Sequence, residues 1–377
     1  MHRNLIASLA VVTLLATPLF GQLKGLPPDG DNQRSTVTQG IGVVKVSIEY
    51  SSPDVHGPSG EDRRGHIWGE LVPWGTTNLG FGTCKECPWR AGANYNTIFT
   101  VSHDVKVQGQ QLRAGKYGLH MIPAKDDDWT LIFSNDAAAW GSFYYDQKND
   151  ALRVKVKPAK SEYHEWLTYE FTDRQTDHAT AALKWEDLQI PFTISVDDIA
   201  SLHLAAIRDD LKNDTGFSWQ SWLQAANYAL TTKHPQDAVE FAQAAVNRTF
   251  IGTENFQTLN MLAMAQEAAG MTAEAKANRD KAMNHPTATA IDLHQYGRQL
   301  LAQGKKEDAL RIWELNAKRF PNMWPVNVGL ARGYSANGRI KDALKYAKLA
   351  YAQAPDELNK KSLEAAIKKL EAGQDMN

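Results

Sequence analysis

Three stretches of the chain share one pattern: AMAQEAAGMTAEA at 263–275, GRQLLAQGKKEDA at 297–309 and ARGYSANGRIKDA at 331–343. The central glycines of these stretches fall 34 residues apart, and their final alanines keep the same step. A step of this length is typical of stacked helical hairpins, in which small residues let two helices approach closely. The pattern therefore predicts a helical-repeat array with Gly270, Gly304 and Gly338 in its turns.

The array extends beyond these stretches. Ala226, Ala238 and Ala245 indicate an earlier hairpin, offset by 37 residues from the next, while Asn316 interrupts the alanine pattern. We expect four hairpins over residues 219–357, then a capping helix and tail over 358–377. The region resembles the tetratricopeptide repeat family, in which the first helix of each hairpin lines a concave groove. By position, the resemblance places five polar residues in that groove: Asn227, Asn260, His294, Arg298 and Arg332.

These five side chains are candidates for binding a peptide. Guanidinium and amide donors in a groove suit an extended peptide or its carboxylate. Ordinary solvated helix residues are the alternative interpretation of each of them. We therefore expect a protein or peptide partner in the groove.

The first half of the chain is rich in strand-forming residues. With no helical spacer between consecutive runs, an antiparallel β-sandwich or jelly roll is expected over 41–197. A linking helix is expected within 198–218, with Asp197 or Asp198 available to cap it. The predicted strands are 42–51, 95–101, 104–108, 115–122, 129–134, 151–157, 165–172, 179–185 and 189–196.

Residues 52–94 form a long connection that carries three tryptophans and both cysteines. A loop of this length inside a domain is commonly functional. The sequence is equally compatible with a folded flap whose tryptophans close the end of the sandwich. Cys84 and Cys87 are expected to form a structural disulfide in an oxidising compartment. A metal site at this pair would need further ligands from histidines that are scattered along the sequence. A redox-active pair normally lies at the N-terminus of a helix, and no helix is predicted after Cys87. We therefore expect neither a metal nor a cofactor.

His120 is the most informative histidine, because it lies in a predicted strand between apolar neighbours. A buried, hydrogen-bonded imidazole is the preferred interpretation. An acid–base cluster with Arg90, His66 and Glu70 is the alternative, and these four are the candidate catalytic residues. The sequence contains no phosphate-binding glycine loop, nucleophile elbow or HExxH motif.

The net charge of the chain indicates which partners to expect, and its first 21 residues indicate where the protein is located. The formal net charge is −2, and neither half is basic enough to indicate nucleic-acid binding. Residues 1–21 place His2 and Arg3 before an apolar run that is short for a membrane span, which favours a cleaved signal peptide. A retained core helix is the alternative. Residues 22–40 are expected to be a flexible linker, and the protein periplasmic or secreted, without a stable membrane anchor.

Several motifs carry a second resemblance. They include EYSSPDV at 49–55, IWGELVPWG at 67–75, WRAGAN at 89–94 and LRAGKYGL at 112–119. In order and spacing they resemble an exported bacterial family known as domain of unknown function 2911, over residues 42–197. The family has no agreed reaction, and its WRxGAN block is usually followed by an acidic residue where this chain has Tyr95. The resemblance therefore implies a fold and export, and no activity.

The sequence as a whole favours an exported binding or scaffold protein without catalytic activity. In this interpretation a β-sandwich that recognises a small ligand or glycan is coupled to a helical-repeat domain that binds a protein. The alternative is a hydrolytic envelope enzyme with its site near the 52–94 loop. A purely structural spacer is less favoured, because the inferred groove is polar and cationic.

Overall fold

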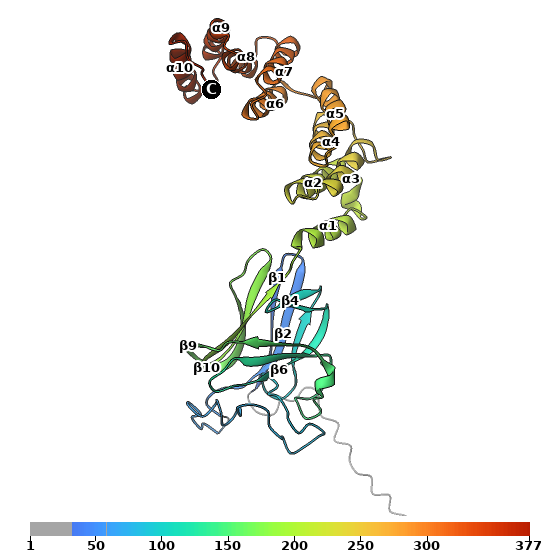
Figure 1. Ribbon diagram of the computed structural model, residues 1–377, viewed down its shortest axis with the longest axis vertical. Coiled ribbons are helices and arrows are strands. Elements are labelled where there is room, and N and C mark those ends of the chain that lie inside the picture. Colours follow the sequence, from blue (N-terminus) through green and yellow to red (C-terminus); the bar gives the residue numbers. More distant parts are fainter. Residues whose placement is uncertain (1–31, 58) are drawn as a thin grey trace, which may run out of the picture. The chain divides into compact units, whose positions relative to one another are not determined.

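The computed structural model describes residues 32–57 and 59–377. They form two compact units, with the boundary between Leu202 and His203. The first unit consists of antiparallel strands and the second of helices (Figure 1). This confirms the predicted fold class, a β-sandwich followed by a tetratricopeptide-like helical array. The expected signal peptide, 1–21, and residues 22–31 of the expected linker lie outside the described residues. Across the described ranges, no helix combines the length and apolarity needed to span a bilayer.

The larger sheet has six strands in the order β1-β2-β3-β6-β7-β8, and every neighbouring pair is antiparallel. Each of the runs predicted for this part of the chain falls on one of these strands. Their bounds are β1 (Gln33–Ile41), β2 (Val44–Ser52), β3 (Thr97–Val101), β6 (Gly115–Ile122), β7 (Trp129–Ser134) and β8 (Asp150–Val156).

The smaller sheet has the order β5-β4-β10-β9, formed by β4 (Val105–Val107), β5 (Gln110–Leu112), β9 (Ala159–Thr172) and β10 (His178–Ser195). β10 corrects the sequence prediction, because it joins the runs 179–185 and 189–196 into one strand. The interruption between them is a register shift at Glu186, whose φ is 55°. A polar residue that indicated a break in the sequence is therefore a bulge within the strand.

The linker predicted at 22–40 is wrong over residues 33–40, which belong to β1 and pair along their whole length with β2. β1 is an edge strand, and its side chains alternate between exposed and half-buried positions. A strand with one solvated face needs few apolar residues, and here Val37 and Ile41 supply them. The strand was therefore not predicted, because its sequence is mostly polar.

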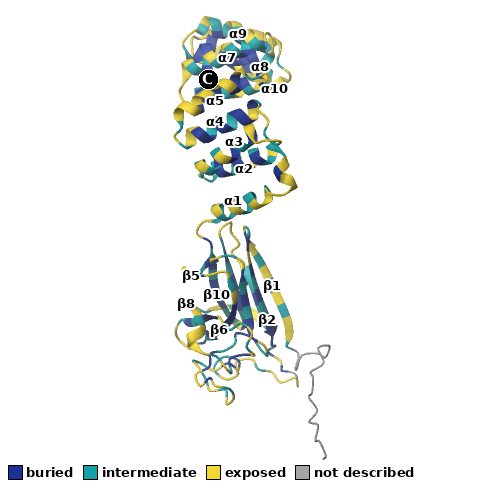
Figure 2. Cartoon of the chain, turned by 90° about the vertical axis from the view of Figure 1, so that its right-hand side faces the viewer, coloured by how far each residue is buried: buried dark blue, intermediate teal, exposed yellow. Residues whose placement is uncertain are grey.

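Both sheets contribute to one core. The rings of Tyr50 on β2 and Tyr169 on β9 lie with centroids 4.9 Å apart, and those of Phe133 on β7 and Phe192 on β10 lie 6.4 Å apart. Figure 2 shows buried residues along the strands of the sandwich. Each large apolar side chain buried in this way contributes about 1.5–3 kcal/mol.

The 52–94 segment packs on this sandwich as a folded flap. Isolated bridges join Asp54 to Trp166 on β9 and Trp89 to Met121 on β6. The Trp68 ring contacts those of Trp89, Trp129 and Trp185, with centroids 5.3–5.8 Å apart. These tryptophans therefore pack against the core. This arrangement agrees with the second interpretation of the sequence, a folded flap whose tryptophans close the sandwich.

The boundary between the two units falls within α1 (Ile199–Asp210), whose first turn is capped by Asp198 accepting from the Ser201 backbone N–H at 2.9 Å. The helices that follow pack in pairs, and α10 (Glu357–Glu371) packs on the second helix of the last pair. The paired helices are α2 (Trp219–Thr231) with α3 (Pro235–Asn247), α4 (Phe256–Ala268) with α5 (Thr272–Asn284), α6 (Ala290–Ala302) with α7 (Lys306–Arg319), and α8 (Trp324–Ala336) with α9 (Ile340–Ala352).

The turns of the hairpins explain the spaced glycines. Gly270, Gly304 and Gly338 have φ values of 79°, 77° and 74°, a left-handed conformation that a side chain disfavours. Lys233 lies 37 residues before Gly270 and has φ 64° in the corresponding turn. The first hairpin therefore keeps the turn geometry without the glycine.

Trp313 on α7 fixes the packing of the third and fourth hairpins. It is fully buried, and a Cβ added at Gly297, Gly329 or Gly333 would stand 2.4–2.7 Å from its ring. Its Nε1 donates to the His294 carbonyl on α6 at 3.2 Å. Asn316, the interruption in the alanine pattern, is buried and donates to the Ala290 carbonyl at 2.8 Å. Together these contacts hold the first helices of both hairpins in place.

Candidate functional site

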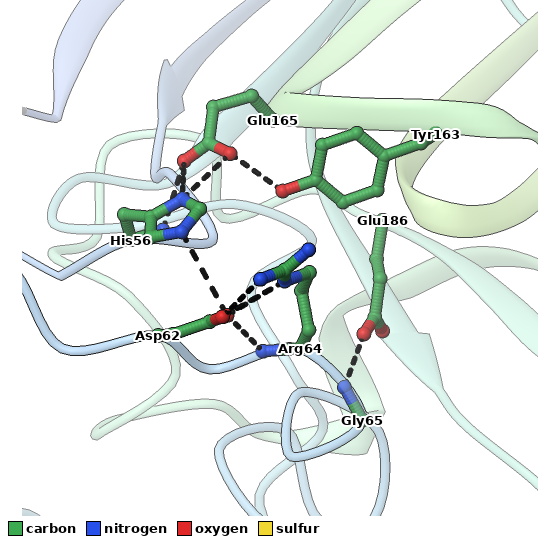
Figure 3. A network of polar contacts seen from close by, with 7 residues as sticks. All are labelled: His56, Asp62, Arg64, Gly65, Tyr163, Glu165 and Glu186. Carbon is green, nitrogen blue, oxygen red and sulfur yellow. Dashed lines mark hydrogen bonds and ion pairs between the residues drawn. The ribbon is translucent and has the colours of Figure 1, made fainter.

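Polar side chains fasten the beginning of the 52–94 segment to β9 (Figure 3). Glu165 accepts from the His56 backbone N–H at 2.8 Å, and from the Tyr163 hydroxyl at 2.6 Å. Burial opposes the ionisation of Glu165, but the hydrogen bonds from Tyr163 and His56 outweigh it and lower its pKa to about 2. The hydrogen bond to Glu165 raises the pKa of Tyr163 to about 12. At neutral pH the carboxylate is therefore charged and the phenol is protonated.

The same network continues around the loop in Figure 3. Arg64 pairs with Asp62 and holds the pKa of that carboxyl well below its usual range. The Gly65 backbone N–H donates to Glu186 at 2.5 Å. Glu165 on β9 and Glu186 on β10 each accept a backbone N–H of the loop, and the network thus anchors the loop to the smaller sheet.

The candidate catalytic residues form two separate pairs. His66 Nδ1 lies 3.0 Å from Glu70, and both side chains are 65% exposed. Arg90 and His120 form the other pair, close enough for the arginine charge to act on the imidazole. Within the described residues, no hydrogen bond or ion pair joins the first pair to the second.

His120 is a buried, neutral imidazole. It is 2% exposed, its Nδ1 lies 3.0 Å from Ser142 Oγ, and its ring packs against Tyr145. Burial and then the charge of Arg90 lower its pKa to about 3. A group with this pKa is poorly matched to general acid–base catalysis near neutral pH. The hydrogen bond to Ser142 was not foreseen from the sequence, because it depends on how the 135–149 loop folds over β6.

Cys84 and Cys87 lie at disulfide distance, with their Cα atoms 5.5 Å apart. The Cys84 backbone N–H donates to the Phe143 carbonyl at 3.0 Å, so the pair ties the flap to the 135–149 loop. In the part of the chain that the structure describes, no group of three His, Cys, Asp or Glu side chains is arranged to hold a metal ion.

Two of the five groove candidates stand apart from the others. Asn227 is exposed on α2. Asn260 is half-buried on α4 and accepts from Arg279 Nη1 at 3.4 Å. These two residues lie on different hairpins and do not line the cavity that contains the other three candidates.

The other three candidates line a single cavity of about 340 Å³, formed by α6, α8 and α10. We call this cavity the repeat pocket. The C-terminal tail also contributes to it, and most of its lining residues, Lys369 and Met376 among them, were not sequence candidates. Its lining includes His294, Arg298, Trp324, Arg332, Lys369 and Met376.

The repeat pocket is cationic. Arg298, Arg332 and Lys369 make no ion pair within the described residues, and no Asp or Glu lines the cavity. Burial and the charge of Arg298 lower the pKa of Arg332. Burial, followed by the charges of Arg332 and Arg298, lowers the pKa of His294 to about 4, so this imidazole is neutral at pH 7. Three positive charges therefore lie around the cavity, and the Asp375 carboxylate of the tail offsets that of Arg332 only in part.

The tail forms one wall of the repeat pocket. Ser335 on α8 donates to Asp375 at 2.5 Å and accepts from the Met376 backbone N–H at 2.9 Å. Arg332 Nη1 donates to Asn377 Oδ1 at 3.1 Å. Lys369 and this tail were missed from the sequence, because they follow the last repeat and have no counterpart in the 34-residue pattern.

Comparison with known proteins gives little beyond the fold. A structure titled "Crystal structure of MamA" aligns with 42% of this chain and 87% of that chain, at 17% identity and a TM-score of 0.29, too low to support an argument. No curated protein matches the chain. Residues 32–194, which span both sheets, match the family described as "Protein of unknown function (DUF2911)", in agreement with the resemblance carried by the motifs at 49–55, 67–75 and 89–94.

Proposed function

We propose that this protein is a binding protein whose helical-repeat array takes up an acidic, extended segment of a partner protein in the repeat pocket. The supporting observation is the group of three cations, Arg298, Arg332 and Lys369, that lack an ion-pair partner within the described residues. Clustered like charges destabilise the free protein, and an anionic partner would remove that cost. Arginine is well suited to this role because its planar fork matches a carboxylate.

Apolar side chains beside the cations refine the expected partner. Trp324, Val328, Leu363 and Met376 line the same cavity. The indole Nε1 of Trp324 has no hydrogen-bond partner within the described residues, which leaves a further donor near the site. The segment that fits best therefore carries an acidic residue next to a large apolar one.

Synthetic peptides test the proposal with the full chain. Eight-residue peptides would carry one to three Asp or Glu residues beside a leucine, and each would have a counterpart with Asn or Gln instead. In calorimetric titrations we expect the acidic peptides to bind at least tenfold more tightly than their counterparts. Rising salt should weaken that binding, because the exposed guanidinium of Arg298 is screened.

A charge-reversed variant locates the binding. Arg298→Glu/Arg332→Glu should abolish the preference for acidic peptides. Lys276→Glu/Lys318→Glu, on α5 and α7, makes the same change in net charge away from the pocket and should bind like the wild type. Circular dichroism would check that both variants fold. Equal affinity for acidic and amide peptides, or unchanged binding by the first variant, contradicts the proposal.

The enzyme alternative has weaker support. A hydrolytic site needs an acid–base group with a pKa near the working pH and within reach of its partner. His120 is held neutral and bonded to Ser142, while His66 and Glu70 pair in solvent. We therefore favour binding over catalysis for the β-sandwich.

We also propose that the protein works outside the cytoplasm, as a scaffold that joins the ligand of its β-sandwich to the partner of its repeats. The support for export is the sequence of residues 1–21. Fusing residues 1–40 to bacterial alkaline phosphatase, which is active only after export, tests this part. An active fusion is expected, and an inactive one would count against export.

A further inference from the structure

The β-sandwich unit contains a cavity of about 340 Å³ around Arg90, which we call the Arg90 pocket. Apolar side chains of the 52–94 segment make up much of its wall, and no Asp or Glu side chain of the described residues lines it. The lining includes Arg63, Leu71, Trp89, Arg90, Ser142 and Trp185. Its size and lining are typical of sites for small molecules.

Arg90 is a partly buried cation that makes no ion pair within the described residues. Its Nη1 donates to the Asn94 carbonyl at 2.7 Å, and its guanidinium lies 5.4 Å from the centre of the Phe143 ring. Burial lowers its pKa, and among the described residues no carboxylate lies within ion-pair distance. Withdrawing a charge even in part from water is unfavourable unless the charge is paired, so the free protein carries an electrostatic cost at this position.

The backbone around Arg90 leaves room for its guanidinium. Gly141 has φ 67°, and a Cβ there would stand 2.7 Å from Arg90 Nη1 and 2.9 Å from Cζ. Any side chain at position 141 would therefore displace the guanidinium. Glycine serves both the turn and the close approach.

Other donors of the Arg90 pocket are also available. Trp185 is 1% exposed, and its Nε1 has no hydrogen-bond partner within the described residues. Ser142 is equally buried, and its hydroxyl contacts the neutral His120. Arg63 is a second cation at the wall, already paired with Glu61. The pocket thus offers donors and one unneutralised positive charge.

We propose that the Arg90 pocket binds a small organic carboxylate, whose oxygens pair with the Arg90 guanidinium and whose apolar body lies against Leu71 and Trp89. The planar fork of arginine matches a carboxylate with two parallel hydrogen bonds. Because Arg90 is the one cation of the pocket without an ion pair among the described residues, a ligand with a single negative charge fits best. The apolar wall excludes a fully hydrated ion such as inorganic phosphate and favours a hydrocarbon chain or ring.

Calorimetric titration of the full chain tests the proposal. The probes are hexanoate and phenylacetate, their primary amides hexanamide and phenylacetamide, and inorganic phosphate. We expect at least one carboxylate to bind, its amide to bind at least tenfold more weakly, and phosphate not to bind. Arg90→Met should weaken carboxylate binding at least tenfold, whereas Arg113→Met, which removes an exposed guanidinium elsewhere, should leave it unchanged.

Two further measurements separate lost binding from lost folding. The ligand-free Arg90→Met variant should melt at the same temperature as the wild type or higher, because the unpaired, partly buried charge is gone. Arg90→Lys keeps the charge without the fork and should bind more weakly than the wild type. The proposal is overturned if neither carboxylate binds at 10 mM, if acid and amide bind equally, if phosphate binds as tightly, or if folded Arg90→Met binds like the wild type.

Discussion

Replacing His120 with asparagine should remove a large part of the pH dependence of the stability of the β-sandwich. The imidazole is buried, and its pKa falls from the ordinary 6.5 to about 3. Between these two pH values the unfolded chain takes up a proton that the folded chain refuses, so acid favours unfolding. The contribution of His120 is therefore complete above pH 6.5 and is lost progressively as the pH falls toward 3.

The size of the effect follows from the two pKa values. Each pH unit below 6.5 costs about 1.4 kcal/mol of folding free energy. From pH 7 to pH 5, the wild type should lose about 2 kcal/mol through this residue alone. Asparagine does not titrate, so the variant keeps only the pH dependence of the other groups. It also carries a constant cost for the smaller side chain, which is independent of pH.

Urea denaturation of both proteins at pH 7 and pH 5, followed by tryptophan fluorescence, measures the effect. The stability advantage of the wild type should shrink by about 2 kcal/mol at pH 5, while contributions from residues such as Glu165 cancel in the comparison. An NMR titration of the His120 ring gives an independent check. An advantage that does not change with pH, or an NMR midpoint near 6.5, would refute the reasoning.

Three further predictions concern packing, turns and the loop network. Trp313→Ala should cost about 3–5 kcal/mol in urea denaturation, because it empties the space between three glycines; a loss below 1 kcal/mol would argue against that packing. Gly304→Ala should cost about 1–2 kcal/mol from its left-handed backbone alone, since the added Cβ meets nothing within 4 Å; no loss would rule out the strain. Glu165→Gln should return the pKa of Tyr163 from about 12 toward 10 in an ultraviolet titration, and an unchanged tyrosine profile would exclude the proposed hydrogen bond.

The helical half was the more predictable from sequence, for a physical reason. A hairpin repeat places equivalent side chains in equivalent surroundings, so Gly304 in the sequence indicated its turn in the structure. The same logic gave His294, Arg298 and Arg332 a common face, and the structure places all three around one pocket. Lys369 was not predicted to line the pocket, because the capping helix has no equivalent in the other repeats with which it could be aligned.

The β-sandwich was predictable as a class and not in its details. Alternating apolar residues indicated its inner strands, but β1 is a polar edge strand and Glu186 interrupts β10. The neighbours of Arg90 were also hidden, because Gly141 and Ser142 come from a distant loop that only the folded chain brings near. Contacts between loops depend on three-dimensional packing, for which the sequence has no local signal.

The central claim is that an acidic segment binds in the repeat pocket, and NMR of the pocket's own side chains tests it most directly. In a titration with an acidic peptide, the Nε–H signals of Arg298 and Arg332 should shift together. Burial and then the charges of Arg332 and Arg298 depress the pKa of His294 to about 4, and this pKa should rise because the bound anion offsets the two charges. Binding that leaves these signals and the His294 titration unchanged would contradict the account.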